Sequence, residues 1–224
     1  MVVSAAQGYE MWSDHYDSTP NPLLALETRM LAPRLGDLCG RTVLDVAAGT
    51  GRWMSYSVAQ GARTLGIDLS AQMLGVASGK TGLSGRLVLG DASVLPFRSD
   101  SFDLAICSFA LSYLPCAAPA LAEMARVARR VVISDMHPAA AQSGWTRGYR
   151  STSDNVQIEH FCHSFEDLDR VARASGLTLE WRAEDRFGLP DLPLFELAGK
   201  KDRFDLVRHT PAVFAASWVK LSCA

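Results

Sequence analysis

The sequence predicts an α/β fold, with a mostly parallel sheet that carries helices on both faces. The first observation is that apolar runs alternate with helical segments from residue 42 to about 136. The second is that these runs are nearly continuous, which is typical of parallel strands buried on both faces. The third is a bulk-free stretch at 47–51, directly after the first apolar run, where a tight turn or a ligand requires small residues.

The expected elements follow one another in a regular order. Five strands are predicted at 41–48, 62–69, 85–91, 101–109 and 129–136. Helices are expected between them at 50–60, 70–80 and 115–128, the second of them capped by a serine. A further helix at 164–176 precedes two closing strands at 178–187 and 211–221, so that seven strands are expected in all.

The two flanking regions differ from this core. Residues 1–38 are predicted to form a helical lid that is broken at Pro20 and Pro22, and residues 39–224 the main domain. The polar stretch 137–163 is too long for an ordinary connection and is expected to be an irregular loop over the active site.

Composition excludes several classes of protein. The chain has 224 residues, 48% of them hydrophobic, and a formal net charge of −2, which favours neither nucleic acid nor a membrane surface as partner. No apolar run is long enough to span a membrane, and no signal peptide is visible. Five scattered cysteines favour reduced thiols in a cytoplasmic protein. The oligomeric state is left open between monomer and homodimer.

The small-residue turn and the acidic end of the second strand fit two classes of cofactor. A dinucleotide fold requires a third glycine in G-x-G-x-x-G, but Met54 occupies that position. The alternative is a nucleoside sulfonium. The segments "LDVAAGTG", "LGIDLSAQML" and "LVLGDASVLPFRSDSFDLAICSFALSYL" resemble, in register, the motifs of class I S-adenosylmethionine-dependent methyltransferases. The start, "GYEMWSDHYD", is similar to the small-molecule branch, which includes quinone- and biotin-pathway enzymes.

The resemblance implies a Rossmann-like, seven-stranded fold and a cofactor site at the strand ends. The residues expected to hold the cofactor are Tyr16, Asp45, Ala47, Gly49, Gly51, Asp68, Leu69, Met73, Asp91, Ala92, Ser108 and Phe109. Asp45 is implied to hold the methionine ammonium, and Asp68 is placed to accept hydrogen bonds from both ribose hydroxyls. Ala47 replaces the family's first glycine, which is tolerable if its backbone stays extended.

The adenine is expected to lie between Leu69 and Met73. Asp91 would accept a hydrogen bond from the exocyclic amine of the adenine, and the main-chain N–H of Ala92 would donate to a ring nitrogen. Ser108 and Phe109, at the end of the fourth strand, would line the methionine part and face the transferable methyl group.

Catalysis needs mainly alignment, because the sulfonium already activates the methyl group. His137 follows the fifth strand and is the candidate general base; the alternative is a loop histidine fixed by the following proline. His15 and Tyr16, on the lid segment, are candidates for contacting the acceptor or the sulfonium.

Further candidates for binding the acceptor are aromatic. Tyr9, Trp12 and Tyr113 could place π faces near the sulfonium, or serve only in packing. In "EHFCHS", His160 and His163 are candidate acceptor contacts; a metal site is not expected there, because no partner cluster exists elsewhere.

The sequence therefore predicts a methyltransferase that acts on oxygen, nitrogen or carbon of a small molecule in a biosynthetic pathway. The alternative is a protein of the same fold that binds the cofactor without methylating, as a cyclase or as a silent partner.

Overall fold

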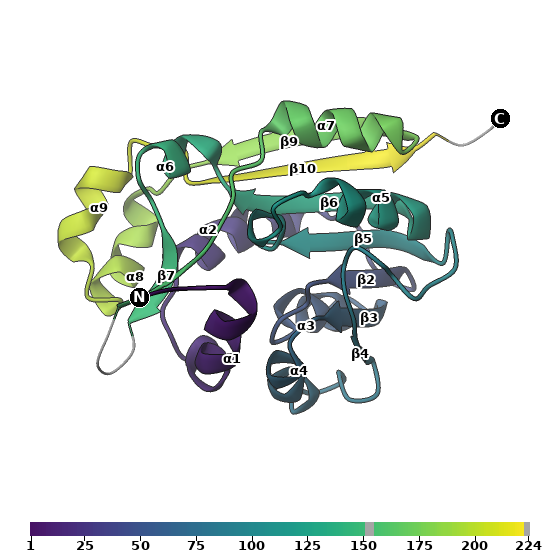
Figure 1. Ribbon diagram of the computed structural model, residues 1–224, viewed down its shortest axis with the longest axis horizontal. Helices are drawn as coiled ribbons and strands as arrows, with labels where there is room; N and C mark the ends of the chain where they lie inside the picture. Colours follow the sequence, from purple (N-terminus) through teal and green to yellow (C-terminus); the bar gives the residue numbers. More distant parts are fainter. Residues whose placement is uncertain (151–154, 222–224) are drawn as a thin grey trace.

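A mostly parallel sheet of seven strands forms the centre of the computed structural model, which describes residues 1–150 and 155–221 (Figure 1). Its spatial order is β4-β3-β2-β5-β6-β10-β9. The strands are β2 (Thr42–Val46), β3 (Arg63–Asp68), β4 (Leu87–Leu89), β5 (Phe102–Ser108), β6 (Ala128–Met136), β9 (Leu177–Asp185) and β10 (Val213–Lys220). The predicted fold class and all seven predicted strands are confirmed.

Strands β2 to β6 run parallel, whereas β10 pairs antiparallel with both β6 and β9. The strand order reverses between β3 and β5, on the two sides of β2. In open α/β sheets this reversal opens a crevice outside the carboxyl ends of the strands, which is the usual place for a ligand.

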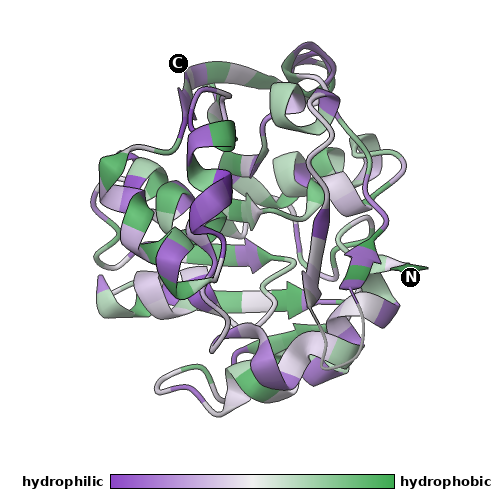
Figure 2. Cartoon of the chain, turned by 90° about the vertical axis from the view of Figure 1, so that its left-hand side faces the viewer, coloured by the Kyte–Doolittle hydropathy of each residue, from purple (hydrophilic) through white to green (hydrophobic). Residues whose placement is uncertain are grey.

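Helices cover both faces of this sheet. The helices are α2 (Pro22–Leu31), α3 (Arg52–Ala59), α4 (Ala71–Ser78), α5 (Ala118–Val127), α7 (Phe165–Ala174), α8 (Leu192–Leu197) and α9 (Lys201–Val207). Along β5, Ala105 and Cys107 join a core with α5 and α7, whereas Leu104 and Ile106 join a core with α2, α8 and α9. Because successive strand residues point to opposite faces, the two cores lie on opposite sides of the sheet. The strands in the middle of Figure 2 are mainly hydrophobic in colour.

The N-terminal segment contains α1 (Ala5–Tyr16), and then α2 and a short 3₁₀ helix η1 (Ala32–Arg34). Ser4 caps α1 and Gln7 completes the capping box. Asn21 caps α2, with Pro22 at its first position, so the predicted break between two helices lies where the prolines are.

Residues 137–163 are more regular than the predicted loop. They contain α6 (Pro138–Gln142) and two strands, β7 (Arg147–Arg150) and β8 (Asn155–Ile158), which pair antiparallel. Strand β8 also pairs in parallel with β1 (Val2–Val3), so the start of the chain and this insertion share a small sheet of three strands. The prediction of an irregular loop is wrong, because main-chain pairing with a segment about 150 residues away in sequence does not show in a local pattern. The boundary between lid and main domain at residue 38 stays a prediction.

Helices α8 and α9 were not predicted. Pro190 and Pro193 interrupt the local pattern, and the helices are short and held by packing of Phe195 and Phe204 into the core. Among the described residues, no helix has the length and apolar character that crossing a membrane requires. Four cysteines are free thiols, and Cys223 lies outside the described residues.

Candidate active site

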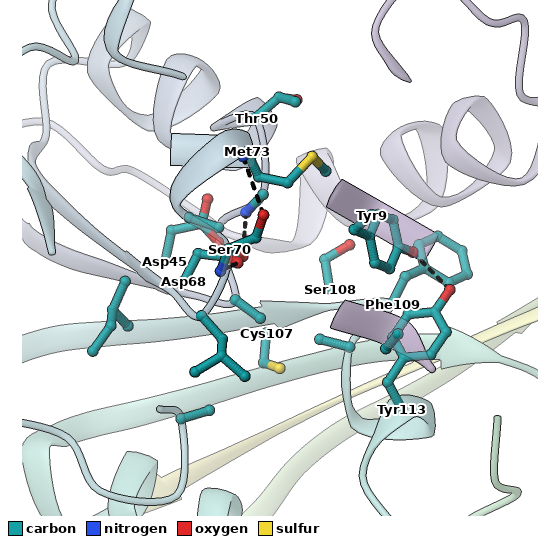
Figure 3. A pocket seen from close by; sticks show the side chains of 18 of the residues that line it. Tyr9, Asp45, Thr50, Asp68, Ser70, Met73, Cys107, Ser108, Phe109 and Tyr113 are labelled. Atoms are coloured by element: carbon teal, nitrogen blue, oxygen red, sulfur yellow. Dashed lines mark hydrogen bonds between the residues drawn. The ribbon is translucent and has the colours of Figure 1, made fainter. Parts of the chain in front are cut away.

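A cavity of about 490 Å³ lies outside the carboxyl ends of β2, β3 and β5, between α1 and α4. This volume is in the usual range for sites that enclose a small ligand. Figure 3 shows two ends of different chemistry: Asp45, Asp68 and Ser70 gather at one end, and the aromatic rings of Tyr9, Phe109 and Tyr113 at the other. Ser108 lies between them.

The predicted cofactor-binding residues mostly share this cavity. Its walls include Tyr16, Asp45, Ala47, Gly49, Asp68, Leu69, Met73, Asp91, Ala92, Ser108 and Phe109. Of the predicted cofactor residues, only Gly51 is not on the wall. Gly51 has φ +79° and precedes α3, and a Cβ there would lie 2.6 Å from the Leu83 side chain. It therefore shapes the bend and the packing beneath the cavity.

The turn after β2 is left-handed at two further positions. Both Gly49 and Ala47 have φ +56°. The condition under which alanine was expected to be tolerable here, an extended backbone, is therefore not met. An L-residue in the left-handed region has a strain of about 1–2 kcal/mol, which the surrounding structure must offset. Main-chain hydrogen bonds from Ala48 N to Ile67 O and from Gly51 N to Ala48 O hold the turn in this shape.

Met54 occupies the place where a dinucleotide fold has its third glycine. A Cβ added to Gly66 on β3 would lie 2.2 Å from the sulfur of Met54. The close approach of α3 and β3 is thus achieved by a glycine on the strand and a methionine on the helix. This arrangement explains how the helix packs closely without the glycine that the dinucleotide motif requires.

Asp68 ends β3 and orders the turn around it. One carboxylate oxygen accepts a hydrogen bond from Gly49 N (2.7 Å) and the other from Ser70 N (2.8 Å). Burial raises the pKa of this carboxyl above its ordinary value, against the effect of these hydrogen bonds. A carboxylate has about four lone-pair sites, so two remain for the hydroxyls of a bound ribose.

Asp45 ends β2 beneath the same turn and is 3% exposed. Its carboxylate accepts a hydrogen bond from Met54 N at 3.0 Å. Burial raises the pKa of this carboxyl to about 7, while the Arg52 guanidinium and the Met54 hydrogen bond act in the opposite direction. The site therefore offers a buried carboxyl whose charge would be stabilised by an incoming ammonium group.

The adenine end of the predicted site has the expected apolar pair. Met73 is buried at 3% exposure, whereas Leu69 is 66% exposed and lines the same cavity. An exposed leucine beside a cavity gains stability when a flat ligand covers it. Asp91 lies at the mouth, where one of its carboxylate oxygens accepts a hydrogen bond from Ser93 N.

A buried ion pair behind Ser108 was not predicted. Glu27 on α2 is fully buried, and its carboxylate lies 2.7 Å from the Arg52 guanidinium. The same carboxylate accepts hydrogen bonds from Ser108 Oγ, Ser134 Oγ and the indole of Trp53. A single glutamate in an amphipathic helix has no sequence pattern that would reveal this network.

The lid segment (residues 1–38) is fastened to the turn after β2 (residues 47–51), called the glycine turn below. Asp17, after α1, accepts a hydrogen bond from Thr50 Oγ1 (2.7 Å) and forms an ion pair with Lys80 (2.6 Å). On α1, Glu10 accepts a hydrogen bond from Gln72 of α4. These contacts place α1 across the cavity as one of its walls.

The aromatic end is built from the lid and from a 3₁₀ turn, η2 (Leu111–Tyr113), that follows β5. Tyr9 and Tyr113 line it and their hydroxyls are hydrogen-bonded at 2.6 Å. Trp12 lies behind this wall, between Tyr16 and Tyr149, with stacking on the latter at 4.6 Å between centroids. The cavity wall does not include Trp12, which agrees with the packing alternative.

The four candidate histidines lie outside the cavity wall. The His137 imidazole accepts a hydrogen bond from Ala139 N as the cap of α6, and its other nitrogen lies 3.2 Å from Glu184. His163 donates to the carbonyls of Leu111 and Leu114. These placements do not support His137 as the base or His163 as an acceptor contact.

His15 and His160 are also away from the cavity. His15 is exposed near the end of α1, and the His160 ring faces the carbonyl of Ile158 at 3.3 Å. In the part of the chain that is described, no three His, Cys, Asp or Glu side chains converge as a metal would need.

Comparison with known proteins agrees with this fold and cavity. Residues 43–131 match the family model described as a methyltransferase domain. The demethylmenaquinone methyltransferase of Lactococcus lactis is 34% identical over 116 residues, which cover 47% of this chain and 46% of that protein. The chain thus matches about half the length of the curated relatives to which it is similar.

Solved structures resemble nearly the whole chain. An S-adenosylmethionine-dependent methyltransferase from Mesorhizobium loti is 20% identical, with a TM-score of 0.68 over 89% of this chain and all of the other. The [4+2]-cyclase SpnF is 19% identical, with a TM-score of 0.62 over 86% of this chain and 80% of the other. At these identities the likeness shows the fold alone.

The fold, the glycine turn and the match of residues 43–131 to a methyltransferase-domain model all support a likeness to the class I, S-adenosylmethionine-dependent methyltransferases. Several curated relatives are demethylmenaquinone methyltransferases, so the chain resembles the quinone-type enzymes.

The residues present fit S-adenosylmethionine, the cofactor of this class. The left-handed turn leaves room above Gly49, where an added Cβ would lie 3.5 Å from the Met73 side chain. The buried carboxylate of Asp45 suits the ammonium and the partly buried carboxylate of Asp68 suits the ribose, while Leu69 with Met73 suits the adenine. The individual residue roles stay predictions.

Proposed function

We propose that this chain catalyses transfer of a methyl group from S-adenosylmethionine to a small-molecule acceptor. The observation that carries the proposal is the single cavity with two chemically different ends: a carboxylate end that suits the cofactor and an aromatic end with room for an acceptor. The net charge of −2 makes a nucleic-acid acceptor a poor electrostatic match. With free thiols at four described cysteines, we place the reaction in the cytoplasm.

In this proposal the bound cofactor supplies a methyl group activated by a positively charged sulfur. The chain's own residues bind and orient the two reactants. Asp45 and Asp68 fix the cofactor at its ammonium and ribose, while Ser108 lines the middle of the cavity and Phe109 its aromatic end. Helix α1, tied to the glycine turn through Asp17 and Thr50, excludes water from the reacting atoms.

The test is incubation of the purified protein with methyl-labelled S-adenosylmethionine and a panel of phenolic, enolic and amine acceptors. Label in a small-molecule product together with stoichiometric S-adenosylhomocysteine is expected. Transfer only to protein or RNA would overturn the proposal.

A second function is favoured by one observation: the candidate base His137 is engaged as a helix cap, and the described wall of the cavity contains no other histidine. A protein that binds the cofactor and steers another reaction needs no such base. Tight cofactor binding without any S-adenosylhomocysteine formation across the panel would favour this function.

A further inference from the structure

The turn that carries Tyr113 is held in place from two sides. The buried carboxylate of Asp135 accepts hydrogen bonds from Ser112 N and Ser112 Oγ, both at 2.9 Å. On the other side, the His163 ring donates to the carbonyls of Leu111 and Leu114. Because the backbone on each side of Tyr113 is fixed, the direction of its phenol into the cavity is set before any ligand binds.

Tyr9 and Tyr113 together leave one phenolic proton for a ligand. Their hydroxyl oxygens lie 2.6 Å apart, so one hydroxyl donates to the other. The receiving hydroxyl keeps its own proton and can donate it into the cavity that both residues line. A donor that itself accepts a hydrogen bond is polarised and donates more strongly.

A buried guanidinium lies behind this pair. The Arg147 side chain is 10% exposed, and its guanidinium carbon lies 4.8 Å from the Phe109 ring centroid and 5.1 Å from that of Tyr113. Its nearest acidic partner, Asp135, is 3.4 Å away and already accepts hydrogen bonds from Ser112 and from Met136 N. The positive charge is therefore only partly used by that ion pair, and it favours negative charge on the far side of the two rings.

The titratable groups at the aromatic end are protonated and cannot act as general bases. Burial raises the pKa of Tyr9, Tyr16, Tyr113 and Cys107, so these groups stay protonated near neutral pH. Of the carboxylates on the described wall, Asp45 and Asp68 lie at the cofactor end (Figure 3). Asp91 and Glu10 are exposed to solvent, and Glu10 accepts a hydrogen bond from Gln72 of α4. An acceptor that must lose a proton to react has no partner at this end to receive it.

We infer that the aromatic end takes a planar acceptor that arrives as a conjugated oxyanion, an acidic phenol or an enolised 1,3-dicarbonyl compound, and that Tyr113 donates a hydrogen bond to that oxygen. This inference rests on the proposed function and names its acceptor class. Tyr9 and Arg147 are positioning residues that act through Tyr113.

All bonds, electron pairs and charges in the proposed methyl transfer are accounted for without a protein base. The electron pair of the oxyanion, or of the carbon conjugated with it, forms the new bond to the methyl carbon while the sulfur–methyl bond breaks. The sulfur keeps the bonding pair, so neutral S-adenosylhomocysteine and neutral methylated product result. When carbon is methylated, the neutral product then loses the proton on that carbon to water, the C–H electron pair restores the conjugated system, and the methylated oxyanion results.

The experiment uses matched pairs of probes on the full chain saturated with S-adenosylhomocysteine, at pH 8. Calorimetry first measures binding of S-adenosylhomocysteine alone, so failure of the proposed function is seen separately. The affinities for 4-nitrophenol, which is then largely anionic, and for neutral nitrobenzene are compared next. A second pair is 1,3-cyclohexanedione and cyclohexanone.

The anionic member of each pair should bind at least about tenfold more tightly than the neutral one. Tyr113→Phe should remove most of this preference, whereas Tyr56→Phe, whose hydroxyl donates to Ala32 O away from the cavity, should keep it. Arg147→Gln should reduce the preference and Arg147→Lys should restore part of it. A merely structural change would instead weaken both members of a pair equally.

Equal affinity for both members of each pair in the wild-type protein overturns the inference. So does a preference that survives Tyr113→Phe, or failure of both anions to bind to protein saturated with S-adenosylhomocysteine.

Discussion

The buried carboxylate of Glu27 lies 2.7 Å from the guanidinium of Arg52, so that α2 is joined by an ion pair to the first residue of α3. Arg52 also donates hydrogen bonds to Thr28 Oγ1 and Ser108 Oγ, and Ser108 in turn donates to Glu27. Helix α2, the glycine turn and the end of β5 therefore form one polar unit under the cavity.

Removing one member of this pair should be strongly destabilising. Arg52→Met leaves the fully buried carboxylate of Glu27 without its charge partner, and we expect a loss of about 2–4 kcal/mol in the free energy of unfolding. The Glu27→Gln variant should lose less, because an amide needs no counter-charge and Arg52 is 30% exposed to water. Urea unfolding measures the free energy of unfolding of both variants. Equal losses in the two variants would contradict this account.

Relief of the backbone strain at Ala47 should stabilise the protein. With φ at +56°, Ala47→Gly should raise the free energy of unfolding by about 1 kcal/mol, because glycine adopts this conformation without a steric cost. The matched control is Ala48→Gly at the neighbouring position, whose φ is not positive and which should lose about 0.5–1 kcal/mol. Thermal unfolding distinguishes them, and a destabilised Ala47→Gly protein would show that the turn is not strained.

The large sheet and the cofactor turn could be predicted because their determinants are local. Periodicity defines the strands, and small residues followed by Asp68 define the turn. The small sheet of β1, β7 and β8 could not be predicted, because it depends on pairing between Val2 and Gln157. Arg147 lies at a position where no motif marks it, and its role depends on rings brought from two other elements.

The histidines show why a residue that follows a strand is not necessarily catalytic. His137 is adjacent in sequence to the end of β6, but the first turn of α6 uses its ring as a cap. Pro138 stands at the first position of α6, where proline is typical, so the residue before it becomes the helix cap.

His137 is accordingly expected to affect stability more than binding. His137→Ala should lose about 0.5–2 kcal/mol in the free energy of unfolding through loss of the α6 cap, and His137→Asn, which can also cap a helix, should recover part of it. Affinity for S-adenosylhomocysteine should change less than threefold in both. Calorimetry checks this, and once an acceptor is known, a turnover loss of about 100-fold in His137→Asn would restore the role of a base.

Asp68 combines two tasks, so its substitution should have two effects. Asp68→Ala should reduce affinity for S-adenosylhomocysteine by roughly 30- to 1000-fold, because the ribose hydroxyls lose a charged acceptor. It should also lower thermal stability, since Gly49 N and Ser70 N lose their partner. The control is Asp100→Ala at an exposed carboxylate paired with Lys220. Unchanged affinity in Asp68→Ala would refute the ribose assignment.

The buried carboxyl of Asp45 predicts a pH dependence with a definite sign. In the ligand-free fold its pKa is raised to about 7, from an ordinary value of 3.8, because burial disfavours the charge. Between about pH 4 and 7 the folded protein therefore binds a proton that the unfolded chain has lost, so this group's contribution to stability falls as pH rises through that window. Asp45→Asn removes the titration and keeps an acceptor for Met54 N, and should make the free energy of unfolding higher than in the wild type at pH 8.

Ligand binding at Asp45 should become stronger as pH rises, whereas the contribution of Asp45 to stability falls. The methionine ammonium needs the ionised carboxylate, so affinity for S-adenosylhomocysteine should rise between pH 6 and 8 and binding at pH 6.5 should release a proton from Asp45. Calorimetry in buffers of different ionisation enthalpy measures that release directly. Asp45→Asn should bind more weakly, by about tenfold or more at pH 8, and should flatten the profile. An Asp45→Asn protein with the wild-type profile would place the ammonium elsewhere in the cavity.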